Sequence, residues 1–211
     1  PEEVARLTRE YGLEVVSLCR GGFFPSTDAE RREEAIEENR KILDEAAALG
    51  APMVVLVCGA DPAQPLWDSR EQIEQGIRAL LPDVERTGVA LAVEPLHPMY
   101  ADTRSAVTSL GEATDLCDRI AHPDVGVALD VYHVWWDPHL EAEIDRCADR
   151  ERLFAFHVCD WRVPTRRFLT DRELMGRGCI PVRRIRECVE GTGFDGPIEV
   201  EIFSEDYWEM D

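Results

Sequence analysis

Four short apolar segments of this chain carry, at their ends, side chains that can bind a metal ion. ALAVE ends on Glu94, VGVALD on Asp130, LFAFH on His157 and PIEVE on Glu201. Each segment is rich in aliphatic or aromatic residues and precedes a loop signal, which is typical of a buried parallel strand that delivers its last residue to a rim. Three carboxylates and one imidazole on one rim predict a metal site.

Strands and helices are predicted to alternate along the chain. The predicted strands span residues 13–19, 52–59, 89–94, 125–130, 152–158 and 197–203, and the predicted helices span residues 2–10, 28–50, 69–87, 105–121, 138–150 and 181–192. Asp28 can cap the second of these helices, and Gly50 can end it. This alternation indicates an α/β protein.

Two architectures fit the alternation, a doubly wound open sheet and a (β/α)₈ TIM barrel. An open sheet usually binds its ligand at one switch point between two strands, whereas a closed barrel brings successive strand ends around one axis. We therefore expect a TIM barrel. Because six predicted strands cannot make eight, we expect residues 1–211 to form a single barrel domain that lacks the first two strands and the last helix.

The composition excludes several classes of function. A formal net charge of −20 disfavours a nucleic-acid partner, because proteins that bind phosphate backbones normally present a basic surface. No apolar stretch approaches the roughly 20 residues of a membrane span, and the first residues resemble an exposed helix more than a signal peptide. The 7 cysteines are scattered without CxxC spacing, which favours reduced thiols and a cytoplasmic location.

Five motifs, taken in order, resemble the xylose isomerase-like TIM barrel family. They are AVEP at 92–95, ALDVYH at 128–133, FHVCD at 156–160, GRGCIP at 176–181 and FDGPIEVEIF at 194–203. The likeness covers nearly the whole chain, and the motifs are specific as an ordered set. That family contains sugar and sugar-phosphate isomerases and epimerases, including ketose 3-epimerases and inosose isomerases. The resemblance implies a small sugar or polyol-ketone substrate and, because related barrels commonly pair, a homo-oligomer.

By this resemblance Glu94, Asp130, His157 and Glu201 lie on the fifth to eighth barrel strands as ligands of one divalent metal. Such an oxygen-rich set suits Mn²⁺, Mg²⁺ or Co²⁺ better than a thiolate-type zinc site; we expect Mn²⁺, with Zn²⁺ as a further alternative. A metal that chelates a carbonyl and its neighbouring hydroxyl stabilises the enediolate left by loss of the intervening proton. In related epimerases the two metal-bound glutamates move this proton, which implies catalytic roles for Glu94 and Glu201.

Glu199 competes with Glu201 for the fourth ligand position. Side chains two residues apart share one face of a strand, so spacing cannot separate them. Alignment with the last strand of the family favours Glu201, and Glu199 would then lie deeper in the barrel and form hydrogen bonds there.

Further residues are candidates for binding the substrate. His133 stands where related enzymes hold a donor to a substrate oxygen, and Asp160 and Arg162 follow on the loop after His157. Related enzymes often carry an arginine in this loop at variable spacing, so Arg166 and Arg167 remain alternatives.

Two aromatic side chains join these candidates. His97 lies in the stiff segment EPLHPMY and could contact substrate, and Trp136 could stack on a sugar ring. Two segments complete the expected site. RGGFFP at 20–25 is expected to be a mobile loop that covers the substrate, with hydrophobic plugging of the barrel mouth as the alternative, and the long segment 160–180 is expected to select the substrate.

The expected activity is a metal-dependent isomerase or epimerase that acts on a sugar, sugar phosphate or inosose. An alternative is a lyase or C-glycoside-cleaving subunit that uses the same deprotonation. A phosphodiesterase resembling abasic-site endonucleases fits less well, because it needs a multi-zinc cluster and the chain has 5 histidines. A metal-free sugar-binding barrel is the non-enzymatic alternative.

Overall fold

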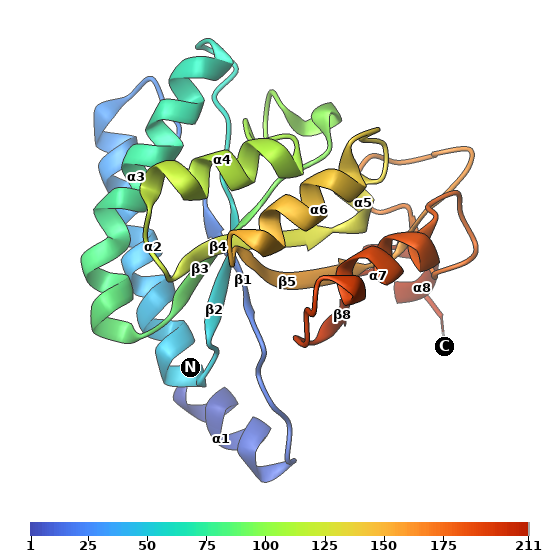
Figure 1. The fold of residues 1–211 in the computed structure, drawn as a ribbon. Helices are drawn as coiled ribbons and strands as arrows, with labels where there is room; N and C mark the ends of the chain where they lie inside the picture. Colours follow the sequence, from blue (N-terminus) through green and yellow to red (C-terminus); the bar gives the residue numbers. More distant parts are fainter. Residues whose placement is uncertain (211) are drawn as a thin grey trace.

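A parallel sheet of six strands runs through the molecule (Figure 1). The structure is a computed structural model and describes residues 1–210. Neighbouring strands follow the order β1 (Leu18–Gly22), β2 (Met53–Val57), β3 (Ala90–Glu94), β4 (Val125–Asp130), β5 (Leu153–Val158) and β8 (Ile198–Val200). All five pairings are parallel, as expected for strands joined by helical crossovers.

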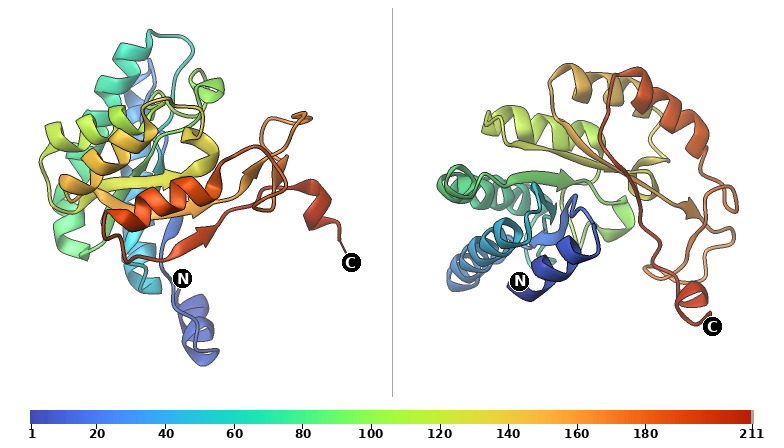
Figure 2. Two further views of the ribbon diagram at one scale, coloured as in Figure 1. Left: turned by 45° about the vertical axis from the view of Figure 1, so that its right-hand side comes forward. Right: turned by 90° about the horizontal axis from the view of Figure 1, so that it is seen from below.

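The main helices lie along the outer side of the curved sheet (Figure 2). They are α2 (Ala29–Leu49), α3 (Leu66–Thr87), α4 (Leu110–Ile120), α6 (Leu140–Asp149) and α7 (Val182–Gly191). The first helix, α1 (Glu2–Glu10), lies below the strands in Figure 1. The short elements are α5 (Val131–Val134), α8 (Glu205–Trp208), the 3₁₀ helix η1 (Pro98–Tyr100) and the antiparallel pair of β6 (Asp160–Trp161) and β7 (Arg172–Glu173). Within residues 1–210, no helix has the length and apolar character needed to cross a bilayer.

The two faces of the sheet carry different side chains. Leu56, Leu91 and Leu129 point outward into the core shared with the helices. The inner face carries a separate cluster of small residues, namely Val55, Ala92, Ala128 and Ala155. Because side chains alternate along a strand, the residues two positions after these alanines also face inward at the rim. These residues are Glu94, Asp130 and His157.

The order of strands and helices agrees with the sequence prediction, and several boundaries do not. The strand predicted at 13–19 is instead Leu18–Gly22, because pairing with β2 begins where Leu18 meets Val54. The helix predicted at 105–121 begins at Leu110, since the Ser109 hydroxyl caps it by accepting a hydrogen bond from the backbone N–H of Glu112 (3.2 Å). The last strand, predicted at 197–203, spans three residues.

The segment 20–25 is part of the sheet and core, so the prediction of a mobile covering loop was wrong for most of it. Gly22 ends β1, where its backbone N–H donates to the Asn39 side chain (2.7 Å). A Cβ atom at Gly22 would lie 2.0 Å from the carbonyl oxygen of Val57, so only glycine fits. Phe24 is buried, whereas Phe23 remains exposed.

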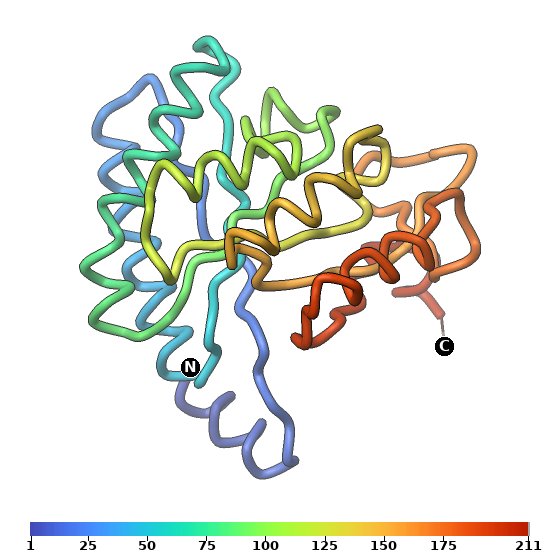
Figure 3. The backbone as a smooth tube through the Cα atoms, viewed as in Figure 1, coloured from blue at the N-terminus to red at the C-terminus, as the bar shows by residue number. Residues whose placement is uncertain are grey.

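The long segment 160–180 projects past the end of the sheet beside the C-terminal residues (orange and red in Figure 3). It is ordered by β6 and β7, and the backbone N–H of Arg172 donates to the carbonyl of Phe203 (3.0 Å). This contact carries Arg172 over the rim of the sheet.

Candidate metal centre

The structure brings together the four strand-end residues Glu94, Asp130, His157 and Glu201. One potential ligand atom of each lies within 4.8 Å of those of the other three. Glu94, Asp130 and His157 are almost fully buried, and the Glu201 side chain is 22% exposed. Glu201 follows the last residue of β8, and its backbone N–H continues the ladder by donating to the carbonyl of Val158 (3.1 Å).

The polar atoms in this cluster fit a cation. His157 Nδ1 lies 3.3 Å from Glu94 Oε1 and 3.4 Å from Glu201 Oε2. His157 Nδ1 and Glu94 Oε1 are both buried without a properly oriented hydrogen-bond partner among residues 1–210. Buried polar atoms are normally satisfied, so converging unpaired ligand atoms suit a bound ion. The residues present therefore fit a divalent metal with oxygen and nitrogen ligands.

Glu199 takes a different place from Glu201. It pairs with His157 across β5 and β8, and its Oε1 atom lies 3.5 Å from His157 Nε2. Its Oε2 atom accepts a hydrogen bond from Ser17 Oγ (2.8 Å). Glu199 thus faces the far nitrogen of the imidazole and can orient the ring, while Nδ1 faces the cluster.

The two glutamates of the cluster differ in their electrostatic environment. Burial raises the pKa of Glu94, and the nearby Glu201 and Asp130 carboxylates raise it further, although His157 partly offsets them. Burial alone would also raise the pKa of Glu201, but His157 and the Arg172 guanidinium outweigh it and lower that pKa. Before metal binds, Glu94 therefore holds a proton more readily than Glu201.

Histidine 157 bears the positive charge of the metal-free cluster. Burial alone would lower its pKa, but the carboxylates of Glu199, Glu201 and Glu94, which lie 3.3–3.5 Å from its ring nitrogens, outweigh burial and raise it. A divalent cation held by these residues would compensate the carboxylates in place of the imidazolium, and His157 would bind it as the neutral ring.

Arg172 is a part of the site that the sequence prediction missed. Its guanidinium is buried, with Nη1 2.7 Å from Asp130 Oδ2 and 3.3 Å from Glu201 Oε2. It also lies over the Tyr132 ring, 4.4 Å from the centroid. In the sequence it stands among other arginines of segment 160–180, and no local motif separates it from them.

His133 lies next to Arg172 and lines the same pocket. Its Nδ1 atom accepts a hydrogen bond from the backbone N–H of His97 (3.1 Å), and its Nε2 atom lies 3.2 Å from Arg172 Nη2. Burial lowers the pKa of His133 to about 3, so the ring is neutral. His133 therefore lines the pocket as a neutral ring in contact with Arg172.

The other predicted substrate-binding residues lie outside the pocket lining. Asp160 is buried, and its carboxylate accepts hydrogen bonds from the backbone N–H groups of Trp161, Gly176, Gly178 and Ile180 at 2.8–2.9 Å. Its oxygens hold the segment 160–180 in shape, and its contact with substrate stays a prediction.

The arginines first considered on this segment are engaged in ion pairs. Arg162 lies 3.0 Å from Asp171 and also pairs with Glu173 and Asp206. Arg166 pairs with Asp171 and Asp206, and Arg167 pairs with Glu205. These contacts fasten the segment to the residues around α8.

His97 and Trp136 contact His133 and do not line the pocket. The Trp136 Nε1–H donates to the carbonyl of His133 (2.8 Å), and the His97 ring lies edge-on to Trp136 with centroids 5.9 Å apart. Both support His133, and their substrate contacts stay a prediction.

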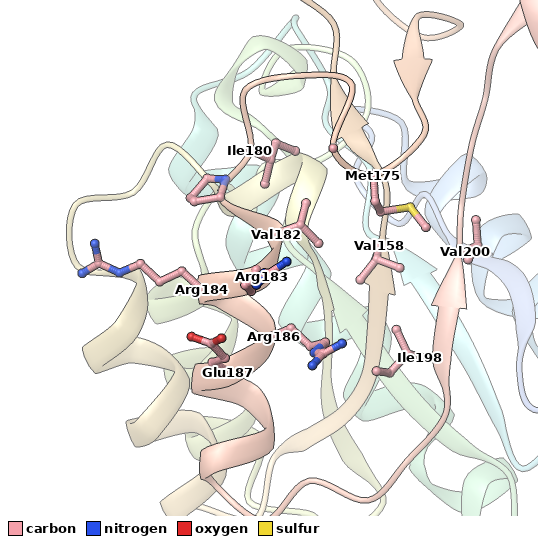
Figure 4. Close-up of a pocket in the computed structure, with 12 residues that line it drawn as sticks. Val158, Met175, Ile180, Val182, Arg183, Arg184, Arg186, Glu187, Ile198 and Val200 are labelled. Atoms are coloured by element: carbon pink, nitrogen blue, oxygen red, sulfur yellow. The ribbon is translucent and has the colours of Figure 1, made fainter.

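A pocket of about 230 Å³ opens above the cluster. It is lined by Cys19, Arg20, Val57, Glu94, Leu96, Tyr100, Arg104, His133, Leu169, Arg172, Glu201 and Phe203. A larger hollow of about 1010 Å³ lies on the outer side between α7 and β8 (Figure 4). Its lining combines apolar side chains such as Ile198 and Val200 with surface arginines and holds none of the four cluster residues, so the chemistry belongs to the smaller pocket.

The profile of the xylose isomerase-like TIM barrel matches residues 1–211. The chain belongs to this family. It is 24% identical over 192 residues to the inosose isomerase of Halalkalibacterium halodurans, a match that covers 89% of this chain and 66% of that protein. The chain therefore spans about two thirds of the length of that relative.

Two crystal structures have the same fold. Protein SMc04130 from Sinorhizobium meliloti is 49% identical with a TM-score of 0.95, and the match covers 99% of this chain and 76% of that one. IolI protein with a bound zinc atom is 21% identical with a TM-score of 0.85, and the match covers 99% and 74% of the two chains. These likenesses agree with the TIM-barrel expectation.

Proposed function

We propose that this chain carries the active site of a divalent-metal-dependent isomerase or epimerase of small sugars or polyol-ketones. The observation that carries the proposal is the cluster of Glu94, Asp130, His157 and Glu201, whose ligand atoms converge within 4.8 Å at the floor of a pocket. The similarity to an inosose isomerase supports the same class of substrate.

The proposed metal ligands are these four residues, with His157 binding through Nδ1. A bound divalent cation supplies electrostatic stabilisation for negative charge that develops on substrate oxygens. Three carboxylates and one imidazole favour Mn²⁺, while Mg²⁺, Co²⁺ and Zn²⁺ suit the same ligand set. The zinc atom in the IolI crystal structure supports a divalent ion here.

Glu94 and Glu201 are the proposed proton carriers. Glu94 ends β3 and Glu201 follows β8, and β4 and β5 lie between these strands in the sheet. The two carboxylates therefore reach the pocket from different sides. One removes the proton from the carbon next to the carbonyl, and the other returns a proton to the opposite face for epimerisation. Return to the neighbouring carbon gives isomerisation.

His133 and Arg172 position the reacting groups in this proposal. The neutral His133 contacts a substrate oxygen, and Arg172 orients the Asp130 and Glu201 carboxylates. The proposal also includes a cytoplasmic location, in keeping with 7 free cysteines, and a homo-oligomeric state.

Hydrogen exchange tests the proposal. The Mn²⁺-loaded protein is incubated in D₂O with a panel of ketoses, inososes and 3-keto-glycosides, and the recovered sugars are analysed by mass spectrometry. We expect deuterium in substrate and product, and loss of exchange with EDTA or in Glu94→Gln and Glu201→Gln. Two smaller products in place of an isomer would instead support a lyase. No exchange with Mn²⁺, Mg²⁺ or Co²⁺ across the panel would refute the isomerase proposal.

A further inference from the structure

We propose that the substrate is an anionic keto-sugar whose carboxylate or phosphate group binds Arg20 and Arg104. The inference rests on the proposed function, because it names the class of substrate for the same site. The two arginines line the pocket together with Glu94, Glu201 and His133. The side chains of Arg20 and Arg104 belong neither to the metal cluster nor to the residues that contact it.

Two arginines that line this pocket lack a carboxylate partner within the part of this acidic chain that the structure describes. The sequence has 43 acidic and 23 basic residues, and most of the arginines form ion pairs, as Arg70 does with Glu112 and Arg146 does with Asp115. Among residues 1–210, Arg20 and Arg104 form no ion pair with a carboxylate. Two unpaired cations in one small pocket therefore indicate a ligand with negative charge.

Both guanidinium groups lie over aromatic rings. The Arg20 guanidinium carbon lies 4.4 Å from the centroid of Phe23, and that of Arg104 lies 5.9 Å from the centroid of Tyr100. Contact with the face of a ring leaves the N–H groups at the edge of the guanidinium free to donate. Such a planar fork suits the oxygens of a carboxylate or a phosphate.

The backbone near both arginines is fixed at the end of β2. The backbone N–H of Phe23 donates to the carbonyl of Val57 (3.0 Å), and the backbone N–H of Gly59 donates to the carbonyl of Arg104 (2.8 Å). Arg104 also donates its own N–H to the carbonyl of Tyr100 (2.9 Å). The backbone of Arg104 and that next to Arg20 are thus ordered, and both side chains line one pocket, which favours one shared anion.

The charges in the pocket lead to the same inference. Arg172 already shares its charge with Asp130 and Glu201. A divalent cation would neutralise those carboxylates further and leave Arg20 and Arg104 uncompensated. A volume of about 230 Å³ is below the roughly 300 Å³ at which drug-sized sites begin, and so fits one sugar unit with one anionic group.

Calorimetric binding to the Mn²⁺-loaded protein tests the inference with three probes of one skeleton. These are D-fructose, D-fructuronate and D-fructose 6-phosphate, which are neutral, carboxylated and phosphorylated. At least one anionic probe should bind about tenfold or more tightly than D-fructose, as expected for hydrogen bonds to a charged group. The tighter of the two identifies carboxylate or phosphate as the anion. Binding without preference for an anion, or binding of none of the probes, would overturn the inference.

Substitutions connect the preference to the two arginines. Arg20→Met and Arg104→Met should each weaken binding of the anionic probe by about tenfold and leave binding of D-fructose unchanged. Arg183→Met is the matched control, because Arg183 is exposed on α7 and also forms no ion pair among residues 1–210. An anion preference that survives in both pocket variants would overturn the inference.

Metal titration separates this inference from the proposed function. Arg20 and Arg104 are outside the metal cluster, so their variants should bind Mn²⁺ as the unsubstituted protein does. Loss of anion preference with intact Mn²⁺ binding and intact deuterium exchange would leave the proposed function standing. Absence of Mn²⁺ binding in the unsubstituted protein would instead contradict the proposed function itself.

Discussion

Replacement of Arg172 by methionine should destabilise the metal-free protein much more than the metal-bound protein. The guanidinium lies 2.7 Å from the fully buried Asp130 carboxylate and 3.3 Å from Glu201, which is 22% exposed on its side chain. Removal of one partner from a buried ion pair costs about 3–5 kcal/mol. Because water can still reach Glu201, we assign most of that cost to Asp130. We expect the free energy of unfolding of the metal-free protein to fall by about 3 kcal/mol.

Bound Mn²⁺ should recover much of this loss, because it supplies positive charge to the same two carboxylates. A recovery of about 2 kcal/mol would appear, through the thermodynamic cycle, as a roughly 30-fold lower Kd for Mn²⁺ in Arg172→Met. Urea denaturation in EDTA and in excess Mn²⁺ measures both stabilities, and calorimetry measures the Kd independently.

The control for this prediction is Arg186→Met. Arg186 forms an exposed ion pair with Glu190 one helical turn away, so its loss should cost less than about 0.5 kcal/mol in either condition. If Arg172→Met lowered the free energy of unfolding equally with and without Mn²⁺, or by less than about 1 kcal/mol in EDTA, Arg172 would not stand in for the metal charge.

Three further predictions follow from buried polar groups. Asp160→Ala should cost about 3 kcal/mol in urea denaturation and speed proteolysis within segment 160–180, because four backbone donors lose their acceptor; unchanged proteolysis would contradict this role. Burial raises the pKa of Glu94 to about 7 in the folded, metal-free protein. The contribution of Glu94 to the free energy of unfolding is therefore largest below its unfolded pKa and declines as the pH rises toward about 7. Glu94→Gln should therefore gain stability relative to the unsubstituted protein between pH 5 and 7 in EDTA, and a constant difference would refute the assignment. Burial raises the pKa of Cys117 to about 12, so iodoacetamide should leave Cys117 unmodified until the protein unfolds, whereas rapid native labelling would show that the α4 core opens.

The strand-end residues could be predicted to meet because parallel strands finish on the same rim. Alternation along each strand then puts Glu94, Asp130 and His157 on the inner face, two positions beyond small residues that leave room for them. Apolar runs and a capping aspartate were sufficient to predict the order of the strands and helices. The choice of Glu201 over Glu199 needed family likeness, since both share one face and only the course of the chain past β8 separates them.

Tertiary contacts decided what the sequence could not predict. Arg172 reaches the cluster because β7 pairs with the chain near Phe203, a contact between segments that no local pattern reveals. Asp160 looked like a substrate ligand because it is polar and close to His157, but the turn at 176–180 brings its backbone donors to that carboxylate. The first strand begins later than predicted because its pairing with β2 starts where Leu18 meets Val54.

The central claim is a single metal site made by four strand-end residues. The most direct measurement is a calorimetric titration of EDTA-treated protein with Mn²⁺, repeated for His157→Ala and for Glu190→Gln, a substitution at an exposed position of α7. The account predicts about one Mn²⁺ per chain, loss of binding in His157→Ala and unchanged binding in Glu190→Gln. Mn²⁺ binding that persists unchanged in His157→Ala, or no binding by the unsubstituted protein, would contradict it.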